Sequence, residues 1–155
     1  MADITKIVAD LIAVIGMTMT PPAGATPLEP PVIQQLEPEE LQARACGKKC
    51  NVLAWFGPDG VIYIDRRVNP EVNKVARGIL LHELVHHVQK QQLGKNSSDC
   101  KEWLRREREA YEIQAHWLFK QGIDPTPLMW QVRTMQCHPM AFGGGQAAEG
   151  VRPGR

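Results

Sequence analysis

The strongest constraint on the fold is a helical segment that is apolar nearly all round and yet contains ionisable side chains. Residues 79–89 read Ile-Leu-Leu-His-Glu-Leu-Val-His-His-Val-Gln. A helix with apolar side chains on most of its faces lies in the middle of a core. A polar group buried there costs about 1–3 kcal/mol unless it finds a partner. His82, Glu83 and His86 therefore need partners inside the protein.

The spacing of these side chains predicts a metal site. His82 and His86 are four residues apart, so both project from one helix face and can reach one ion. Glu83 is rotated by about 100° from His82, which places it beside that face. Zinc binds neutral imidazoles and lowers the pKa of its water to about 7, and a carboxylate can then take the proton. The alternative is a metal-free helical core in which the histidines only form hydrogen bonds.

A second helical segment, residues 106–119, supplies candidates for a third ligand: Glu107, Glu109 and Glu112. At 100° per residue, Glu107 falls within the apolar face and Gln114 lies seven residues further along it. Glu109 and Glu112 fall on the opposite face, which we expect to be solvated. Two histidines and Glu107 would leave a fourth position for water, as in catalytic zinc sites. The apolar face itself comprises Trp103, Leu104, Ala110, Tyr111, Trp117 and Leu118.

Two β-type runs precede the first of these helices. Residues 51–56 and 61–65 flank Gly57-Pro58-Asp59-Gly60, which predicts a hairpin packed against a helix. Helices are expected from Asn69-Pro70 to about 92, from about 99 to 121 and over 127–136, with a short one over 39–45. The fold class is therefore α+β and mostly helical, with a small sheet on a central helix and a second, antiparallel helix carrying Glu107.

The chain divides into four regions in this interpretation. Residues 21–45 form a Pro-rich connector, residues 46–140 the metal-binding domain, and residues 141–155 a flexible Gly-rich tail. Residues 1–20 form an amphipathic helix or, alternatively, a signal-like segment before Ala23-Gly24-Ala25. We favour the helix because one face is apolar and the other carries Asp3, Lys6 and Asp10. The stretch is too short and too charged for a transmembrane span.

The composition says more about possible binding partners than about activity. The formal net charge is +1 and the charged fraction 23%, so nothing predicts nucleic-acid binding. Four cysteines favour an oxidising compartment, periplasmic or extracellular, slightly over the cytoplasm. Cys46 and Cys50 are close enough to bridge locally, which would leave Cys100 with Cys137; four reduced, buried cysteines are the alternative. Oligomeric state is left open by the sequence.

Together, the segments HELVH and, 21 residues after His86, Glu107-Arg108-Glu109-Ala110-Tyr111 resemble the minimal gluzincin metallopeptidases. The whole pattern, HELVHHVQ followed by REREAYEIQ, also looks like a group of small bacterial proteins with that layout. The resemblance covers roughly residues 50–120. It implies that His82, His86 and Glu107 bind one zinc ion and that Glu83 is the general base. Tyr111 stands where the family usually has Asp or Asn, so Tyr111 or Gln114 would have to orient a ligand histidine.

The resemblance also implies a strand beside the active-site helix whose edge binds an extended peptide, and residues 61–65 are the natural candidate. The expected function is that of a zinc-dependent hydrolase, a peptidase acting on peptide or protein substrates. Tyr63, Tyr111 or a histidine would stabilise the oxyanion. The alternative is a non-catalytic module, stapled by zinc, that binds another protein.

Overall fold

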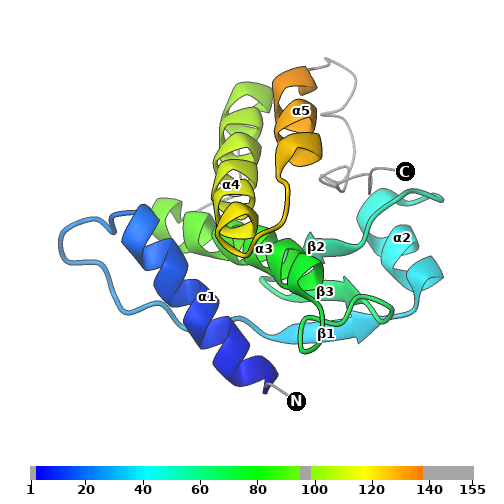
Figure 1. Cartoon of the computed structure of the whole chain (residues 1–155), viewed down its shortest axis with the longest axis horizontal. Helices are drawn as coiled ribbons and strands as arrows, with labels where there is room; N and C mark the ends of the chain where they lie inside the picture. Colours follow the sequence, from blue (N-terminus) through cyan, green and yellow to red (C-terminus); the bar gives the residue numbers. More distant parts are fainter. Residues whose placement is uncertain (1–2, 95–98, 138–155) are drawn as a thin grey trace.

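A computed structural model of the chain describes residues 3–94 and 99–137. It is an α+β protein, mostly helical, with a small three-stranded sheet, as predicted (Figure 1). The predicted tail over residues 141–155 lies outside the described residues. In chain order the elements are α1 (Ile4–Thr18), β1 (Ile33–Leu36), α2 (Pro38–Cys46), β2 (Ala54–Phe56), β3 (Ile62–Asp65), α3 (Lys74–Leu93), α4 (Cys100–Lys120) and α5 (Thr126–Thr134).

The sheet has the strand order β1-β3-β2. β2 and β3 form the predicted antiparallel hairpin, with Ala54 opposite Ile64. β1 pairs in parallel with β3, so that Ile33 faces Ile62. This strand lies within the Pro-rich stretch that we expected to be an unpaired connector. Its sequence, Ile-Gln-Gln-Leu, shows no apolar alternation, and prolines precede it, which only an edge strand tolerates easily.

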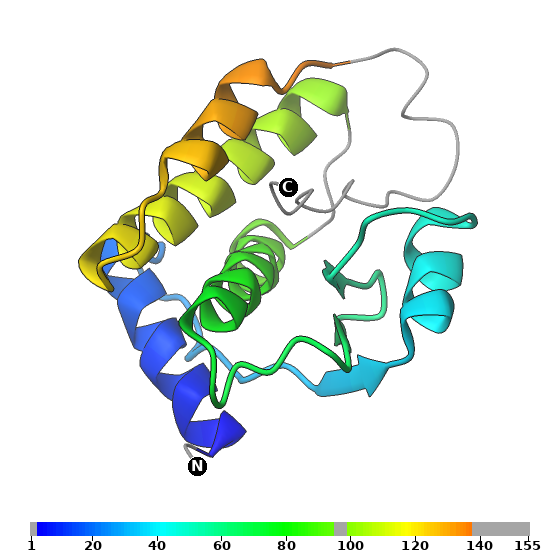
Figure 2. The ribbon, with the colours of Figure 1, turned by 45° about the vertical axis from the view of Figure 1, so that its right-hand side comes forward.

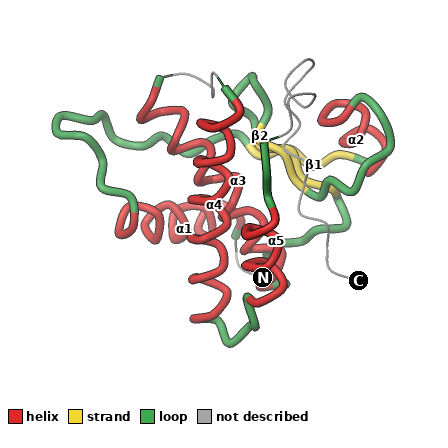
Figure 3. Tube along the Cα trace, turned by 90° about the horizontal axis from the view of Figure 1, so that it is seen from above, coloured by secondary structure: helices red, strands yellow, loops and turns green. Residues whose placement is uncertain are grey.

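The central strand β3 is covered on both faces. Ile62 and Ile64 join the main core with α1 and α3, whereas Tyr63 packs under α2 beside Leu41. Figure 3 shows the sheet with α2 on one side and the remaining helices on the other. The expectation that residues 61–65 offer a free edge to a peptide is therefore wrong, because β1 and β2 occupy both edges of β3. Among the described residues, the edges of the sheet that remain unpaired belong to β1 and β2.

Helix α3 is the central helix, as predicted, and packs against α4, α1, β2 and β3. It begins at Lys74 and not at the predicted Asn69-Pro70. Asn73 is the N-cap, since its Oδ1 accepts a hydrogen bond from the Ala76 amide at 3.1 Å. Asn69 instead accepts from the Glu71 amide and closes a turn. Consequently Val72 lies before the helix and is 68% exposed.

Helices α3 and α4 approach each other closely. A Cβ added at Gly78 would come within 2.9 Å of Leu118 Cδ2, and Ala110 on the facing helix is fully buried. Small side chains at both positions let the two helix axes lie near each other. In Figure 2, α4 and α5 run side by side along one edge of the molecule, with α3 beneath them. This packing brings polar side chains of α3 to those of α4.

Helix α1 contributes to the main core. Ile7, Val8, Leu11 and Ile15 are buried, and α1 lies against α3. Asp3 caps the helix by accepting from the Thr5 amide. This is the arrangement expected for the amphipathic-helix interpretation. Within residues 3–94 and 99–137, no helix combines the length and apolarity needed to cross a membrane.

All four cysteines form disulfides, in the pairing that the spacing favoured. Cys46–Cys50 joins the end of α2 to the segment before β2. Cys100–Cys137 joins the first residue of α4 to the segment that follows α5. The second bridge fixes the end of the helix that carries Glu107. Disulfides persist in oxidising compartments, which is consistent with the compartment favoured from the sequence.

Candidate metal centre

Three of the predicted side chains converge between α3 and α4. His82 Nε2 lies 3.3 Å from Glu107 Oε2, and His86 Nε2 lies 2.9 Å from Glu107 Oε1. The two Nε2 atoms are 3.1 Å apart. One ligand atom from each residue fits within 4.8 Å, so this group could hold a metal ion. Helical phase therefore selected the correct acid of α4 for the cluster.

The electrostatics of the cluster are those of a buried ion pair. Glu107 is 2% exposed; burial alone would raise its pKa, but the two histidines outweigh burial and hold it well below its usual range. Burial also opposes a charge on His86, yet Glu107 raises the pKa of His86 to about 9. In the absence of a metal, a proton on His86 therefore balances the Glu107 carboxylate near neutral pH.

A cation fits this arrangement better than a neutral set of side chains does. If both imidazoles present unprotonated Nε2 atoms, two nitrogen lone pairs and a carboxylate face one another at about 3 Å. Only a positive charge between them removes that repulsion, and the choice is a proton or a metal ion. Two imidazoles and one carboxylate, with a further position left to water, are a donor set typical of catalytic zinc. The residues present therefore fit such an ion.

Glu83 lies beside this cluster and is 6% exposed. Its Oε2 has no hydrogen-bond partner among the residues that the structure describes. Burial raises the pKa of Glu83, against the favourable charges of His82 and His86 and the backbone amide of Phe56. A buried carboxyl with a raised pKa and an available oxygen is suited to exchange protons with a neighbouring group.

The Phe56 amide belongs to the free edge of β2. Leu53 O accepts from the Asp65 amide and the Gly57 amide donates to Val61 O, so odd-numbered residues of this segment bond to β3. Antiparallel pairing alternates, and the backbone groups of Ala54 and Phe56 therefore point away from β3. The edge of β2 thus lies next to Glu83, in the position that we had expected for β3.

A residue that the sequence interpretation missed contacts the cluster directly. Gln89 Oε1 lies 2.9 Å from His86 Nδ1, and Gln89 is 2% exposed. It is the last residue of HELVHHVQ, three positions after His86, and so lies on nearly the same helix face. That spacing was a signal that could have found it. The candidates considered instead were Tyr111 and Gln114.

Those two candidates lie near the cluster in different ways. The Tyr111 ring packs on the His82 ring, with centroids 4.3 Å apart, and so fixes the plane of the imidazole. Burial raises the pKa of Tyr111, and the charges of Glu107 and Glu83 add to this effect. Gln114 is buried on the same helix face. Among the described residues, neither His82 Nδ1 nor Gln114 Oε1 has a hydrogen-bond partner.

Tyr63 is not part of the cluster. It lies on the α2 face of the sheet, where its hydroxyl donates to Asp59 Oδ2 at 2.6 Å and its ring stacks on Trp55. His87 points away from His82 and His86. Its Nε2 donates to the Glu29 carbonyl at 2.7 Å, and burial lowers its pKa.

The charged face predicted for α4 is only partly solvated. Glu112 is exposed, as expected. Glu109 is half-buried and accepts from Gln89 at 2.9 Å. Arg106 is 7% exposed and donates to Glu102. Its long side chain lies along the α3–α4 interface, so a charged residue can cover apolar surface and still reach a carboxylate.

Comparison with known proteins places the chain in a family whose activity is not described. No curated protein and no solved structure is significantly similar to it. One family model matches residues 23–140, which include the cluster, the sheet and both disulfides but not α1. Because that match covers most of the chain, the protein belongs to the family described as a domain of unknown function, DUF6647.

Proposed function

We propose that this protein is a zinc-dependent hydrolase that acts on peptides, with His82, His86 and Glu107 as metal ligands. The observation that carries the proposal is the buried convergence of these three donors within 4.8 Å, with Glu83 beside them. A structural zinc site closes its coordination with four protein ligands. Three ligands and a neighbouring unpartnered carboxyl oxygen suit a site that leaves room for water.

Glu83 is the proposed general base. When zinc is bound, it supplies a water of lowered pKa and a Lewis acid for the scissile carbonyl. Glu83 takes the proton of the attacking water at Oε2, which has no hydrogen-bond partner among the described residues, and later delivers it to the leaving amine. Its raised pKa favours the protonated form that makes this delivery. The Phe56 amide favours the ionised form that the first step requires.

The proposed substrate class follows from the edge of β2. The Phe56 amide is directed at Glu83, but an extended peptide can pair with the outward backbone groups of Ala54 and with the Phe56 carbonyl, which brings its own backbone next to Glu83. Main-chain pairing of this kind gives affinity with little dependence on side chains. The edge is short, and we therefore expect weak ground-state binding and broad sequence tolerance.

The decisive variant is Glu83→Gln, which removes the proton acceptor and keeps the shape. Wild type should cleave members of a diverse peptide library, and a chelator should abolish that cleavage. Glu83→Gln should bind zinc as wild type does and lose turnover by a factor of about 100 or more. Peptide products would be measured by mass spectrometry and zinc by elemental analysis. Equal turnover in the two proteins would exclude Glu83 as the base.

A zinc-stapled binding module is the second candidate, because the three donors join the two helices that form the centre of the core. In such a protein the metal contributes folding free energy and no chemistry. Removing zinc would then unfold the protein, and no peptide in the library would be cleaved with zinc present. Retained folding without zinc, together with zinc-dependent cleavage, would exclude this second function.

A further inference from the structure

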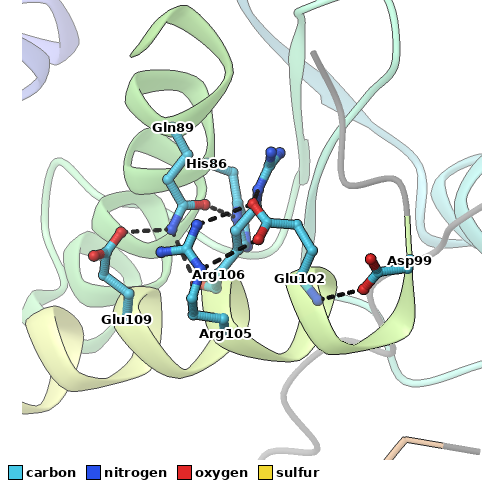
Figure 4. A network of polar contacts seen from close by, with 7 residues as sticks. All are labelled: His86, Gln89, Asp99, Glu102, Arg105, Arg106 and Glu109. Carbon is cyan, nitrogen blue, oxygen red and sulfur yellow. Dashed lines mark hydrogen bonds and ion pairs between the residues drawn. The ribbon is translucent and has the colours of Figure 1, made fainter. Parts of the chain in front are cut away.

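The side-chain amide of Gln89 joins the two helices of the candidate metal centre. Its Oε1 meets His86 Nδ1 on α3 at 2.9 Å. Its Nε2 donates to two groups of α4, the Arg106 carbonyl at 3.0 Å and Glu109 Oε1 at 2.9 Å. Figure 4 shows these contacts and the charged side chains around them. The oxygen and both hydrogens of this buried amide are thus directed at the site or its support.

The partners of the amide fix which way round it lies. Both groups at Nε2 are acceptors, a carbonyl and a carboxylate, and neither can donate. A flipped amide would set its oxygen against two oxygens and its NH₂ group against His86. Only one orientation satisfies all three contacts, and in it Gln89 Oε1 accepts a hydrogen bond. His86 Nδ1 must therefore carry a proton, so Nε2, which faces Glu107 Oε1 at 2.9 Å, is the nitrogen that can give up its proton and offer a lone pair to a metal ion.

The Gln89 amide also fixes the position of Glu107 relative to His86. Its contact at the Arg106 carbonyl is to the backbone one residue before Glu107. One side chain thus bonds to a ligand ring on α3 and to the backbone next to a ligand on α4. On the α4 side, Glu102 accepts from Arg106 Nε and Arg105 Nη2 at 2.9 Å each. These ion pairs order the turn of α4 that Gln89 contacts.

We infer that Gln89 is a positioning residue of the metal centre, which selects the metal-binding tautomer of His86 and fixes His86 relative to Glu107. The inference rests on the proposed function, since it assigns a role toward the metal proposed there. Partners of this kind orient a ligand histidine and increase its basicity, and losing one typically costs about 10–100-fold in metal affinity. Gln89 acts through His86 and the α4 backbone and does not itself bind the ion.

The test replaces Gln89 by methionine, which keeps the length and removes all three hydrogen bonds. Gln89→Met should bind zinc about 10–100-fold more weakly than wild type in competition with a chromophoric chelator. Gln92→Met is the matched control, since it makes the same substitution one turn further along α3 and should leave zinc affinity unchanged. Spectra of ¹⁵N-labelled histidine in the zinc-loaded proteins should show a protected Nδ1 proton on His86 in wild type and Gln92→Met, and its loss in Gln89→Met.

Gln89→Glu separates the two halves of the role. It keeps an acceptor for His86 Nδ1 but has no donor for the Arg106 carbonyl and faces Glu109. Gln89→Glu should therefore retain the His86 tautomer but bind zinc more weakly than wild type. Adding Glu109→Gln should restore part of the zinc affinity, because the new amide returns a hydrogen-bond donor. Gln89→Met with wild-type zinc affinity and an unchanged His86 spectrum would overturn the role of Gln89 alone. A wild type that binds no zinc would overturn the proposed function and this role together.

Discussion

Two buried acids, one in the sheet and one between the central helices, differ in what neutralises them. Asp65 at the end of β3 is fully buried and accepts from Arg67 Nη2 at 2.6 Å and from the Arg67 amide at 2.9 Å. Glu107 is equally buried, but the groups facing its carboxylate are the imidazoles of His82 and His86. The guanidinium is a permanent cation, whereas an imidazole is charged only while it holds a proton.

That difference separates a closed ion pair from an exchangeable one. Burial raises the pKa of Asp65, but the hydrogen bonds and charge of Arg67 outweigh it and leave the pKa low. The ion pair of Asp65 and Arg67 needs no further positive charge. Around Glu107, the charge can be supplied by a proton on His86 or by a metal ion, and neighbouring atoms of His82 and Glu83 have no partner among the described residues. The ion pair in the sheet is therefore complete, whereas the cluster between α3 and α4 could still hold a metal ion.

The two regions also differ in the length of chain that their disulfides close. Removing the disulfides should give the largest effects on stability. Cys100–Cys137, near the metal centre, closes a separation of 37 residues, whereas Cys46–Cys50, beside the sheet, closes one of 4. Chain entropy gives about 4 kcal/mol for the long bridge and about 2 kcal/mol for the short one. Denaturant unfolding of the two double Cys→Ser variants would measure the difference. Equal losses of stability would show that chain entropy does not govern the contribution of these bridges.

A crossed pair of substitutions tests the contrast between the acids. Glu107→Ala should lower zinc affinity by about 100-fold or more, because losing a ligand costs at least as much as losing an outer partner. Asp65→Ala should leave zinc affinity unchanged and reduce the free energy of unfolding by about 1–3 kcal/mol. Zinc at 100 times the wild-type Kd should stabilise wild type and Asp65→Ala by about 2.7 kcal/mol, and Glu107→Ala by about 0.4 kcal/mol or less. Zinc binding that depends on Asp65 would contradict this division.

The local features of both regions could be predicted from the sequence. Helical phase placed His82, His86 and Glu107 on facing surfaces, and strand alternation placed Tyr63 opposite Ile62 and Ile64. Each inference needs only the periodicity of one element. The same alternation could have excluded Tyr63 from the site, once the face of the sheet that α3 covers was known. These are the features on which the proposed function depends.

Features that depend on contacts between distant segments were missed. β1 has no apolar alternation and exists because its backbone pairs with β3, 29 residues further along. Gln89 gains its role from the register of α4, which brings the Arg106 carbonyl within 3.0 Å. The predicted start of α3 was wrong for a local reason. Asn69 and Asn73 are equally good N-cap residues, and the helix begins after Asn73 because Asn69 closes a turn at Pro70. The sequence thus identified the three side chains that converge, but not the contacts that support them.

The pH dependence of zinc affinity should distinguish the two acids next. His86 has a folded pKa raised to about 9, so its charge stabilises the metal-free protein fully below pH 6.5, and that stability is lost as pH rises through 9. Zinc must displace this proton, and its affinity should therefore rise about tenfold per pH unit from pH 7 and level off above 9. Asp65, whose pKa is lowered, contributes stability lost only in acid and adds nothing over this range. Competition titrations at several pH values would measure the slope, and a flat profile would exclude a proton on His86.

The smallest effect should come from the two acids on the outer side of α4. Glu109→Ala removes one of the two acceptors that hold the Gln89 amide, while the Arg106 carbonyl still holds the other hydrogen of its NH₂ group. Because the amide keeps its orientation, zinc affinity should fall less than in Gln89→Met, by up to about tenfold. Glu112→Ala, at an exposed position one turn further along α4, is the control and should leave zinc affinity unchanged. If Glu109→Ala lost zinc as completely as Glu107→Ala, Glu109 would be a ligand, and the division of roles among the acids of α4 would have to be redrawn.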